Sequence, residues 1–284
     1  MGQFILFNGI LIRKIGPLWV SAGRVGIGAV GCWAFFFAFG KKLPMNKRLY
    51  KHFLVLGILG YTIPFALFPL SQEYLAAGVA AIVNAMTPIM TVLVSHYWPG
   101  GEKANWSKFL GVIAGFLGVV VLAAPALSAD GTSQIWAIGA CLTATLCYAV
   151  SLNYTRSLGE IDPSAFAACA LTGATLGAVP LAFYAHGVPV LVTAEGWFSI
   201  IAIGLVATAF AFQIMYRILP RIGATNFSVV TFIAPVSAII LGIAFLEETI
   251  LPSHILGMLG IFIGLLLIDG RIVQRFMPTF IQGS

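Results

Sequence analysis

Long hydrophobic runs follow one another along this chain, and only short polar stretches separate them. A helix needs about 20 mainly apolar residues to cross the hydrocarbon core of a bilayer. Helix-ending residues such as Pro99-Gly100 and Asp162-Pro163 mark the breaks between runs. The pattern predicts ten membrane-spanning helices, of which the first is short. They cover residues 1–12, 17–39, 53–71, 76–97, 108–124, 135–157, 163–185, 195–217, 223–246 and 253–270.

The composition favours the same class of protein. Hydrophobic residues make up 60% of the chain and charged residues 8%, with a mean hydropathy of +1.01. A typical soluble domain has about 25% charged residues. Because the hydrophobic runs use nearly the whole chain, no room remains for a separate soluble domain. We therefore expect an all-α membrane protein.

The distribution of positive charge predicts the orientation, because cytoplasmic loops carry an excess of Lys and Arg. With the N-terminus inside, twelve of the fifteen Lys and Arg residues fall on the cytoplasmic side. These are Lys41, Lys42, Lys47, Arg48, Lys51, Lys103, Lys108, Arg156, Arg217, Arg221, Arg271 and Arg275. We expect a multi-pass protein of the cell inner (plasma) membrane, with both termini cytoplasmic and a cytoplasmic tail at 271–284.

The net charge of +6 would also suit a nucleic-acid-binding protein. However, the cationic residues lie in short loops and at chain ends instead of on one contiguous face, so we expect no nucleic-acid partner. The four cysteines all fall in apolar runs, where they pack as small side chains and form no loop disulfide. They are Cys32, Cys141, Cys147 and Cys169.

The chain matches itself when it is shifted by 147 residues, and after a one-residue gap the match continues at a shift of 146. The pairs include Gly57 with Gly204, Phe65 with Phe212, Pro88 with Pro235, Gly111 with Gly257 and Gly118 with Gly264. Each half contains five predicted spans, so the second half starts on the opposite membrane face. This is the inverted-repeat design of many transporters. We expect one repeat at 1–124 and the other at 133–270.

Two motifs recur in the halves. The stretch "AAGVAAIVNAMTPIMTVLVSHYWPGGE" is followed by a Gly-rich segment at 111–122, and "GATNFSVVTFIAPVSAIILGIAFLEE" by one at 257–268. In these motifs the chain resembles the paired EamA-type domains of the drug/metabolite transporter superfamily, over essentially its whole length. The resemblance implies a ten-helix carrier with both termini cytoplasmic. It also implies a shortened first helix, because "MGQFILFNGI" is similar only to the second half of a family first helix.

The ionisable residues exclude several functions. No acid lies well inside a span, whereas proton-coupled carriers usually place a carboxylate at mid-depth. The four histidines lie at span ends without metal-ligand spacing, and no nucleophile, base and acid come together. We therefore expect no enzyme activity, no metal site and no cofactor. The histidines are His52, His96, His186 and His254.

Arg24 is the one charged residue well inside a predicted span. It is a candidate contact for a substrate carboxylate. Because it lies seven residues into the span and near the outer face, its long stem also allows the guanidinium to reach the lipid headgroups. We favour this second interpretation from the sequence.

Uncharged polar residues and prolines at mid-span are the remaining candidates for a substrate cavity. They are Gln3, Tyr61, Asn84, Thr87, Pro88, Tyr148, Ser151, Gln213, Thr231 and Pro235. Asn84 and Thr231 stand at equivalent places, each four residues before a proline, and proline leaves the carbonyl four residues earlier unbonded. That carbonyl should face water, substrate or a neighbouring helix. Substrate binding and inter-helix packing, worth about 0.6 kcal/mol per hydrogen bond, both stay open here.

Small residues line one face of the last span of each half and indicate close helix contact, either between the repeats or in a homodimer. They are Gly111, Gly115 and Gly118, and Gly257, Gly260 and Gly264. Together, these patterns and the resemblance predict a secondary transporter that moves a small uncharged or zwitterionic metabolite or amino acid by alternating access, and the resemblance implies export. The alternative is a non-transporting receptor or scaffold on the same fold. A wet cavity at the freed carbonyls would favour transport, and a dry or lipid-facing pair would favour the scaffold.

Overall fold

The computed structural model describes residues 11, 15–39, 48–128, 132–159, 161–189, 193–228, 239–240, 243–244 and 251–269. Within these residues the chain forms α-helices, two π-helical segments and turns, and no strand. The prediction of an all-helical protein is therefore confirmed.

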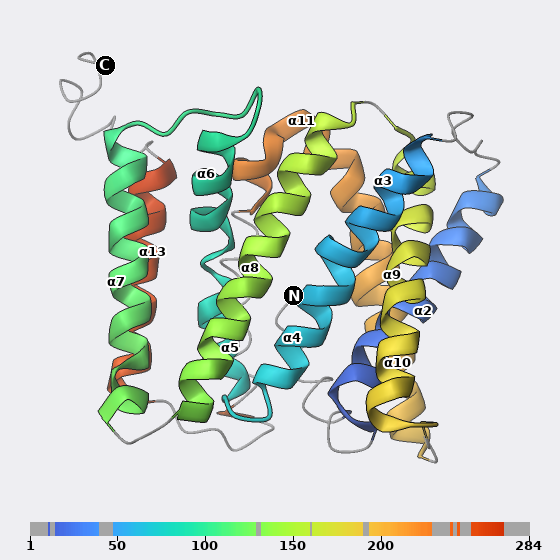
Figure 1. The fold of residues 1–284 in the computed structure, drawn as a ribbon, viewed down its shortest axis with the longest axis horizontal. Coiled ribbons are helices and arrows are strands. Elements are labelled where there is room, and N and C mark those ends of the chain that lie inside the picture. The colour runs from blue at the N-terminus through green and yellow to red at the C-terminus, as the bar shows by residue number, and fades with distance from the viewer. Residues whose placement is uncertain are drawn as a thin grey trace.

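The helices run side by side along one common direction, as Figure 1 shows. They are α2 (Pro17–Ala38), α3 (Arg48–Gly57), α4 (Ile63–Ser71), α5 (Ala77–Asn84), α6 (Thr87–Tyr97), α7 (Trp106–Ser128), α8 (Thr132–Ser157), α9 (Pro163–His186), α10 (Ala194–Gly204), α11 (Ala211–Ser228) and α13 (Pro252–Asp269). The π-helical segments are η1 (Ile58–Thr62), between α3 and α4, and η2 (Leu205–Phe210), between α10 and α11.

Seven stretches of the described chain are long and apolar enough to cross a membrane. They are Pro17–Ala38, Leu49–Ser71, Ala77–Tyr97, Trp106–Pro125, Thr132–Ser157, Pro163–His186 and Gly196–Gly223. These coincide with predicted spans two to eight, and the shorter apolar helix Pro252–Ile268 coincides with the tenth. The predicted spans 1–12 and 223–246 lie largely outside the described residues, so the total of ten stays a prediction.

Two predicted spans are less regular than the hydrophobic pattern indicates. The span predicted at 76–97 consists of α5 and α6, and the helix is interrupted at Ala85 and Met86, just before Pro88. In α11 the backbone leaves the helical region at Gly223, with φ 81° and ψ 166°. Glycine tolerates this left-handed φ, and the ninth span was predicted to begin at the same residue.

The interior contains two large hydrophobic clusters that meet at α8. The first cluster gathers side chains from α2, α3, η1, α4, α9 and α11, and the second gathers side chains from α4 to α8 and from α13. Tyr148 on α8 packs against both clusters. In Figure 1, α8 accordingly crosses the middle of the molecule, between the α7–α13 pair and the α2–α9 side.

Helix α2 packs along α9, and two tryptophans join them by hydrogen bonds. Trp33 Nε1 donates to Thr172 Oγ1 at 2.9 Å, and Trp19 Nε1 donates to the Gly187 carbonyl at 2.9 Å. These contacts fix which face of α2 points inward. They leave the remaining inward positions of α2 facing α4, α10 and η2.

Helices α7 and α13 pack backbone against backbone through their glycines. A Cβ atom added to Gly118 would lie 2.7 Å from the Gly257 carbonyl oxygen, and one added to Gly111 would lie 2.4 Å from that of Gly264. Real Cβ atoms do not approach other atoms so closely, so a larger residue would push the helices apart. The expected close contact is therefore present between these two helices. The homodimer stays a prediction.

This packing predicts that Gly118→Ala destabilises the protein by about 1–3 kcal/mol, because the new methyl group meets backbone atoms that cannot rotate away. Gly139→Ala on α8 is the matched control, since no atom lies within 4 Å of a Cβ added there. Thermal unfolding of both variants in detergent, followed by size-exclusion chromatography, measures the difference. Equal unfolding temperatures for the two variants would contradict the close approach of α7 and α13.

Candidate functional site

Arg24 lies inside the protein, with 7% of its surface exposed. Its Nε donates a hydrogen bond to Thr208 Oγ1 at 2.9 Å, and its guanidinium carbon lies 3.8 Å from the centre of the Phe65 ring. The expectation that Arg24 reaches the lipid headgroups is therefore wrong. The reason is the orientation of α2, because its packing against α9 and η2 turns the Arg24 face inward.

The two π-helical segments supply the polar partners around this arginine. A π-turn widens the helix and disturbs its regular backbone hydrogen bonds. In η2, the Thr208 hydroxyl donates to the Ile203 carbonyl, five residues earlier, at 2.9 Å, and its oxygen accepts the bond from Arg24. In η1, Thr62 Oγ1 donates to the Ala174 carbonyl on α9 at 2.9 Å and lies 3.3 Å from the Gly57 carbonyl, five residues earlier. The η2 threonine thus binds a carbonyl of its own segment, whereas the η1 threonine joins its segment to α9.

Aromatic rings surround the arginine on the α4, α8 and α11 sides. The Tyr61 ring lies 4.8 Å from that of Phe212, and its hydroxyl is hydrogen-bonded to the Tyr216 hydroxyl. The Tyr148 ring lies 6.3 Å from Phe65 and interacts electrostatically with Arg24. The site therefore combines one cation with a set of π faces and phenol hydroxyls.

Gln213 adds a second buried polar group on α11, with 2% of its surface exposed. Its Oε1 accepts a hydrogen bond from Ser164 Oγ at 2.7 Å. Its Nε2 interacts with the Cys32 thiol and has no other hydrogen-bond partner among the described residues. A side-chain amide carries two N–H donors, so this group can also bind a ligand oxygen.

The helix break at Pro88 frees a carbonyl, as the sequence predicted, but the partner of that carbonyl is local. Thr87 Oγ1 donates to the Asn84 carbonyl at 2.7 Å and lies 3.4 Å from the Asn84 Oδ1. The expectation that this carbonyl faces water, substrate or another helix is therefore wrong. Asn84 and Thr87 are both buried, at 3% and 2% exposure.

The structure divides the predicted cavity residues into two groups. Arg24, Tyr61 and Gln213 lie on helices that form the first hydrophobic cluster, and Tyr148 packs against both clusters. Asn84, Thr87 and Pro88 lie at the α5–α6 break. Ser151 packs against the Gly60 backbone, where an added Cβ would lie 2.2 Å from its hydroxyl. Gln3, Thr231 and Pro235 fall outside the described residues.

Several contact residues were not foreseen from the sequence. Thr208 was missed because nothing in the sequence marks the π-helical segment η2, although the Gly57–Gly204 match pointed to the right place. Tyr216 was missed although it lies on α11, one turn after the predicted Gln213. Ser164 was missed because it stands at the start of α9, where Asp162 accepts hydrogen bonds from its backbone and that of Ala165.

The cysteines and histidines form no metal centre in the part of the chain that is described. No group of three or more His, Cys, Asp or Glu side chains gathers there, and all four cysteines are buried and free. His52 Nδ1 lies 2.5 Å from the Tyr154 hydroxyl, and His96 Nδ1 accepts the Ala104 amide at 2.9 Å. These two histidines therefore hold local structure at helix ends.

Comparisons with known proteins agree with this architecture. The model of the EamA-like transporter family matches residues 1–124 and 135–269. An uncharacterized transporter of Archaeoglobus fulgidus is 27% identical over 262 residues, which cover 89% of this chain and 90% of that protein. YoaV, an uncharacterized transporter of Bacillus subtilis, is 26% identical over 274 residues, which cover 95% of this chain and 89% of that protein.

A solved crystal structure shares the fold. It superposes with a TM-score of 0.67 at 19% identity, over 94% of this chain and 95% of that chain. The resemblance seen in the sequence motifs is thus confirmed by a family match over most of the chain. This protein is a multi-pass membrane protein and belongs to the EamA-like transporter family.

Proposed function

We propose that the protein is a secondary transporter that exports a small uncharged or zwitterionic metabolite, such as an amino acid, across the inner membrane. Membership of a transporter family supports the general role. The observation that carries the finer proposal is the buried Arg24, held against Phe65 and Thr208 inside the helix bundle. Ionisable residues at such depth usually mark a substrate or ion pathway.

The chemistry of the site favours a substrate with a carboxylate. A buried guanidinium binds carboxylates through paired, charge-assisted hydrogen bonds, which are stronger where water is excluded. The Gln213 amide offers a second donor. The aromatic rings would stabilise an ammonium group through their faces. An amino acid satisfies all of these groups at once.

Recurring contacts support two inverted repeats, at 1–124 and 133–270. At a shift of 146, Gly111 is equivalent to Gly257 and Gly118 to Gly264. The contacts are crossed, because Gly111 packs against Gly264 and Gly118 packs against Gly257. This crossed pattern is what a two-fold axis between α7 and α13 produces.

The π-helical segments support the same relation. Segments η1 and η2 begin 147 residues apart. Each segment carries a threonine whose hydroxyl binds a backbone carbonyl, Thr62 that of Ala174 on α9 and Thr208 that of Ile203. These bends flank Arg24, and we propose that they act as pivots while the two halves rock in alternating access. A carrier of this kind exposes the site to each side of the membrane in turn.

One observation favours the alternative of a non-transporting scaffold. The Asn84 carbonyl, expected at a wet cavity, is buried and already paired with Thr87. This pairing supports a packing role for the α5–α6 break, and we propose Arg24 and Gln213 as the groups on which transport depends.

Arg24→Gln should reduce amino-acid export at least tenfold, because it removes a charged contact worth about 1.5–3 kcal/mol. Export is measured as amino acids released by cells that express the protein and are fed dipeptides. Arg217→Gln on the exposed face of α11 is the control and should leave export unchanged. Normal export by Arg24→Gln at equal membrane abundance, or no amino acid released above the level of empty cells, would overturn the proposal.

Thr87→Val should lower stability by about 1–3 kcal/mol, because it leaves the buried Asn84 carbonyl without its donor. Thr87→Ser keeps the hydroxyl and should be close to the parent protein. Thermal unfolding in detergent compares the two variants. If Thr87→Val is as stable as Thr87→Ser but loses export, the hydroxyl serves the substrate instead of the fold.

The proposed orientation, with both termini cytoplasmic, can be tested with single cysteines, because the four native thiols are buried. Cysteines placed at 41–51 should be shielded from impermeant thiol reagents in intact cells, and those placed at 127–133 should react. Labelling in broken cells shows that both sites are reactive. The reverse pattern in intact cells would contradict the orientation.

A further inference from the structure

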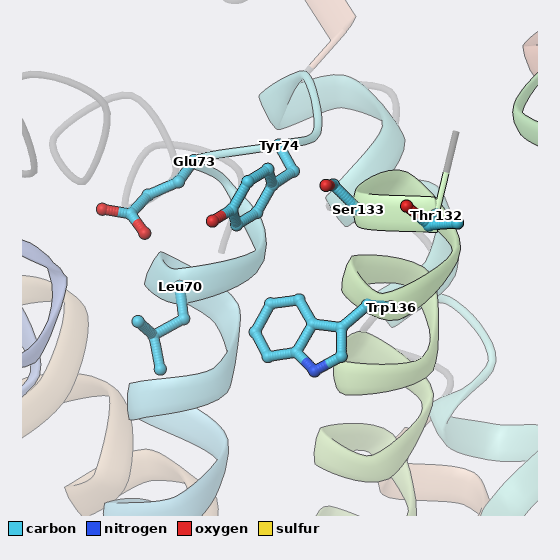
Figure 2. A pocket seen from close by; sticks show the side chains of 6 residues that line it. All are labelled: Leu70, Glu73, Tyr74, Thr132, Ser133 and Trp136. Carbon is cyan, nitrogen blue, oxygen red and sulfur yellow. The ribbon is translucent and has the colours of Figure 1, made fainter. Parts of the chain in front are cut away.

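A pocket opens between the end of α4 and the start of α8, in helices that also carry Phe65 and Tyr148. Its volume is about 360 Å³, and Figure 2 shows the six side chains that line it. They are Leu70, Glu73, Tyr74, Thr132, Ser133 and Trp136. The mid-span cavity residues predicted from the sequence do not include any of them.

Glu73 gives this pocket a negative charge. The Glu73 side chain is exposed, and it forms no ion pair within the described residues, where Glu102 is the carboxylate that pairs with Lys108 and Arg156. The helix ends nearby have opposing effects, since a helix C-terminus carries roughly −0.5 charge and an N-terminus roughly +0.5. The partial charges at the end of α4 and at the start of α8 therefore largely cancel, and the full negative charge of Glu73 makes the pocket negative.

Two aromatic rings line the same pocket as this carboxylate. The rings of Tyr74 and Trp136 are 6.0 Å apart and meet edge to face at 80°. About half of each side chain is exposed, at 49% and 50%. In Figure 2 the Tyr74 ring lies between the Glu73 carboxylate and the Trp136 ring, and Leu70 lies below Glu73. Exposed aromatic faces next to a carboxylate are the chemistry that recognises an ammonium group.

We propose that this pocket binds an ammonium group, with Glu73 supplying the opposite charge and Tyr74 and Trp136 supplying π faces. The site is separate from Arg24, and its occupancy does not depend on transport. The ammonium group belongs either to a free small molecule or to a lipid headgroup, because aromatic residues at span ends lie at headgroup level.

The test uses choline as the probe and a cysteine in the pocket as the reporter. The four native cysteines are buried, so the Ser133→Cys substitution supplies an accessible thiol for labelling. The protein is placed in nanodiscs of phosphatidylglycerol, which has no ammonium group, and the rate of maleimide labelling is measured with increasing choline. Choline should slow labelling, and its uncharged carbon isostere dimethylbutanol should not.

Matched variants identify the binding groups. In the Ser133→Cys background, Glu73→Gln and Trp136→Leu should each raise the choline concentration that gives half protection about fivefold, in line with exposed ion pairs and cation–π contacts. Trp106→Leu, which removes an exposed tryptophan from α7, should not change it. Equal protection by choline and dimethylbutanol, or full protection by choline in Glu73→Gln, would overturn the proposal.

A second arm identifies the source of the ammonium group. The same labelling is measured in phosphatidylcholine nanodiscs without added choline. Slower labelling there than in phosphatidylglycerol, reversed by Glu73→Gln, shows that a lipid headgroup occupies the pocket. Equal labelling in the two lipids, together with protection by free choline, shows a site for soluble ammonium compounds. Both results support the proposal and differ only in the occupant.

Discussion

A membrane helix that departs from regular α-geometry frees backbone carbonyls that lipid cannot bind, and the rest of this structure depends on how those carbonyls are satisfied. The protein uses one solution twice. Thr87 and Thr208 each donate a hydroxyl to a carbonyl three or five residues earlier in the chain, whereas Thr62 donates to the Ala174 carbonyl on α9. The helices can therefore bend at mid-membrane without exposing a polar group, and the bends position the side chains that matter.

The arginine site follows from one of these threonine bonds. Thr208 has one proton and donates it to Ile203, so its oxygen is free to accept from Arg24. Removing the π-turn would satisfy the Ile203 carbonyl within the helix and would release the Thr208 hydroxyl to turn elsewhere. The position of a buried charge is thus linked to an irregular turn in a different helix, 184 residues further along the chain.

The sequence predicted the membrane segments well because hydrophobic length depends on bilayer thickness, which is the same for every helix. It did not predict the direction of Arg24, because the inward face of α2 is set by Trp33 and Thr172, a contact that spans 139 residues. The π-turns carried no sequence signal. The partner of the Asn84 carbonyl, in contrast, could have been predicted from the sequence. Ser and Thr hydroxyls commonly bind carbonyls three or four residues earlier, and Thr87 directly precedes the proline.

The glycine contact between α7 and α13 has a consequence for the order of biogenesis. The two helices lie at the ends of their halves, and about 140 residues separate them along the chain. The ribosome must therefore complete the second half before Gly111 and Gly118 of α7 meet their partners on α13, whereas Gly115 packs against Ile89 of α6. At a synthesis rate of about 5–20 residues per second, this interval lasts roughly 7–30 seconds. A chain truncated before Pro252 would leave Gly111 and Gly118 without these partners permanently, and membrane quality control could recognise it as unfinished.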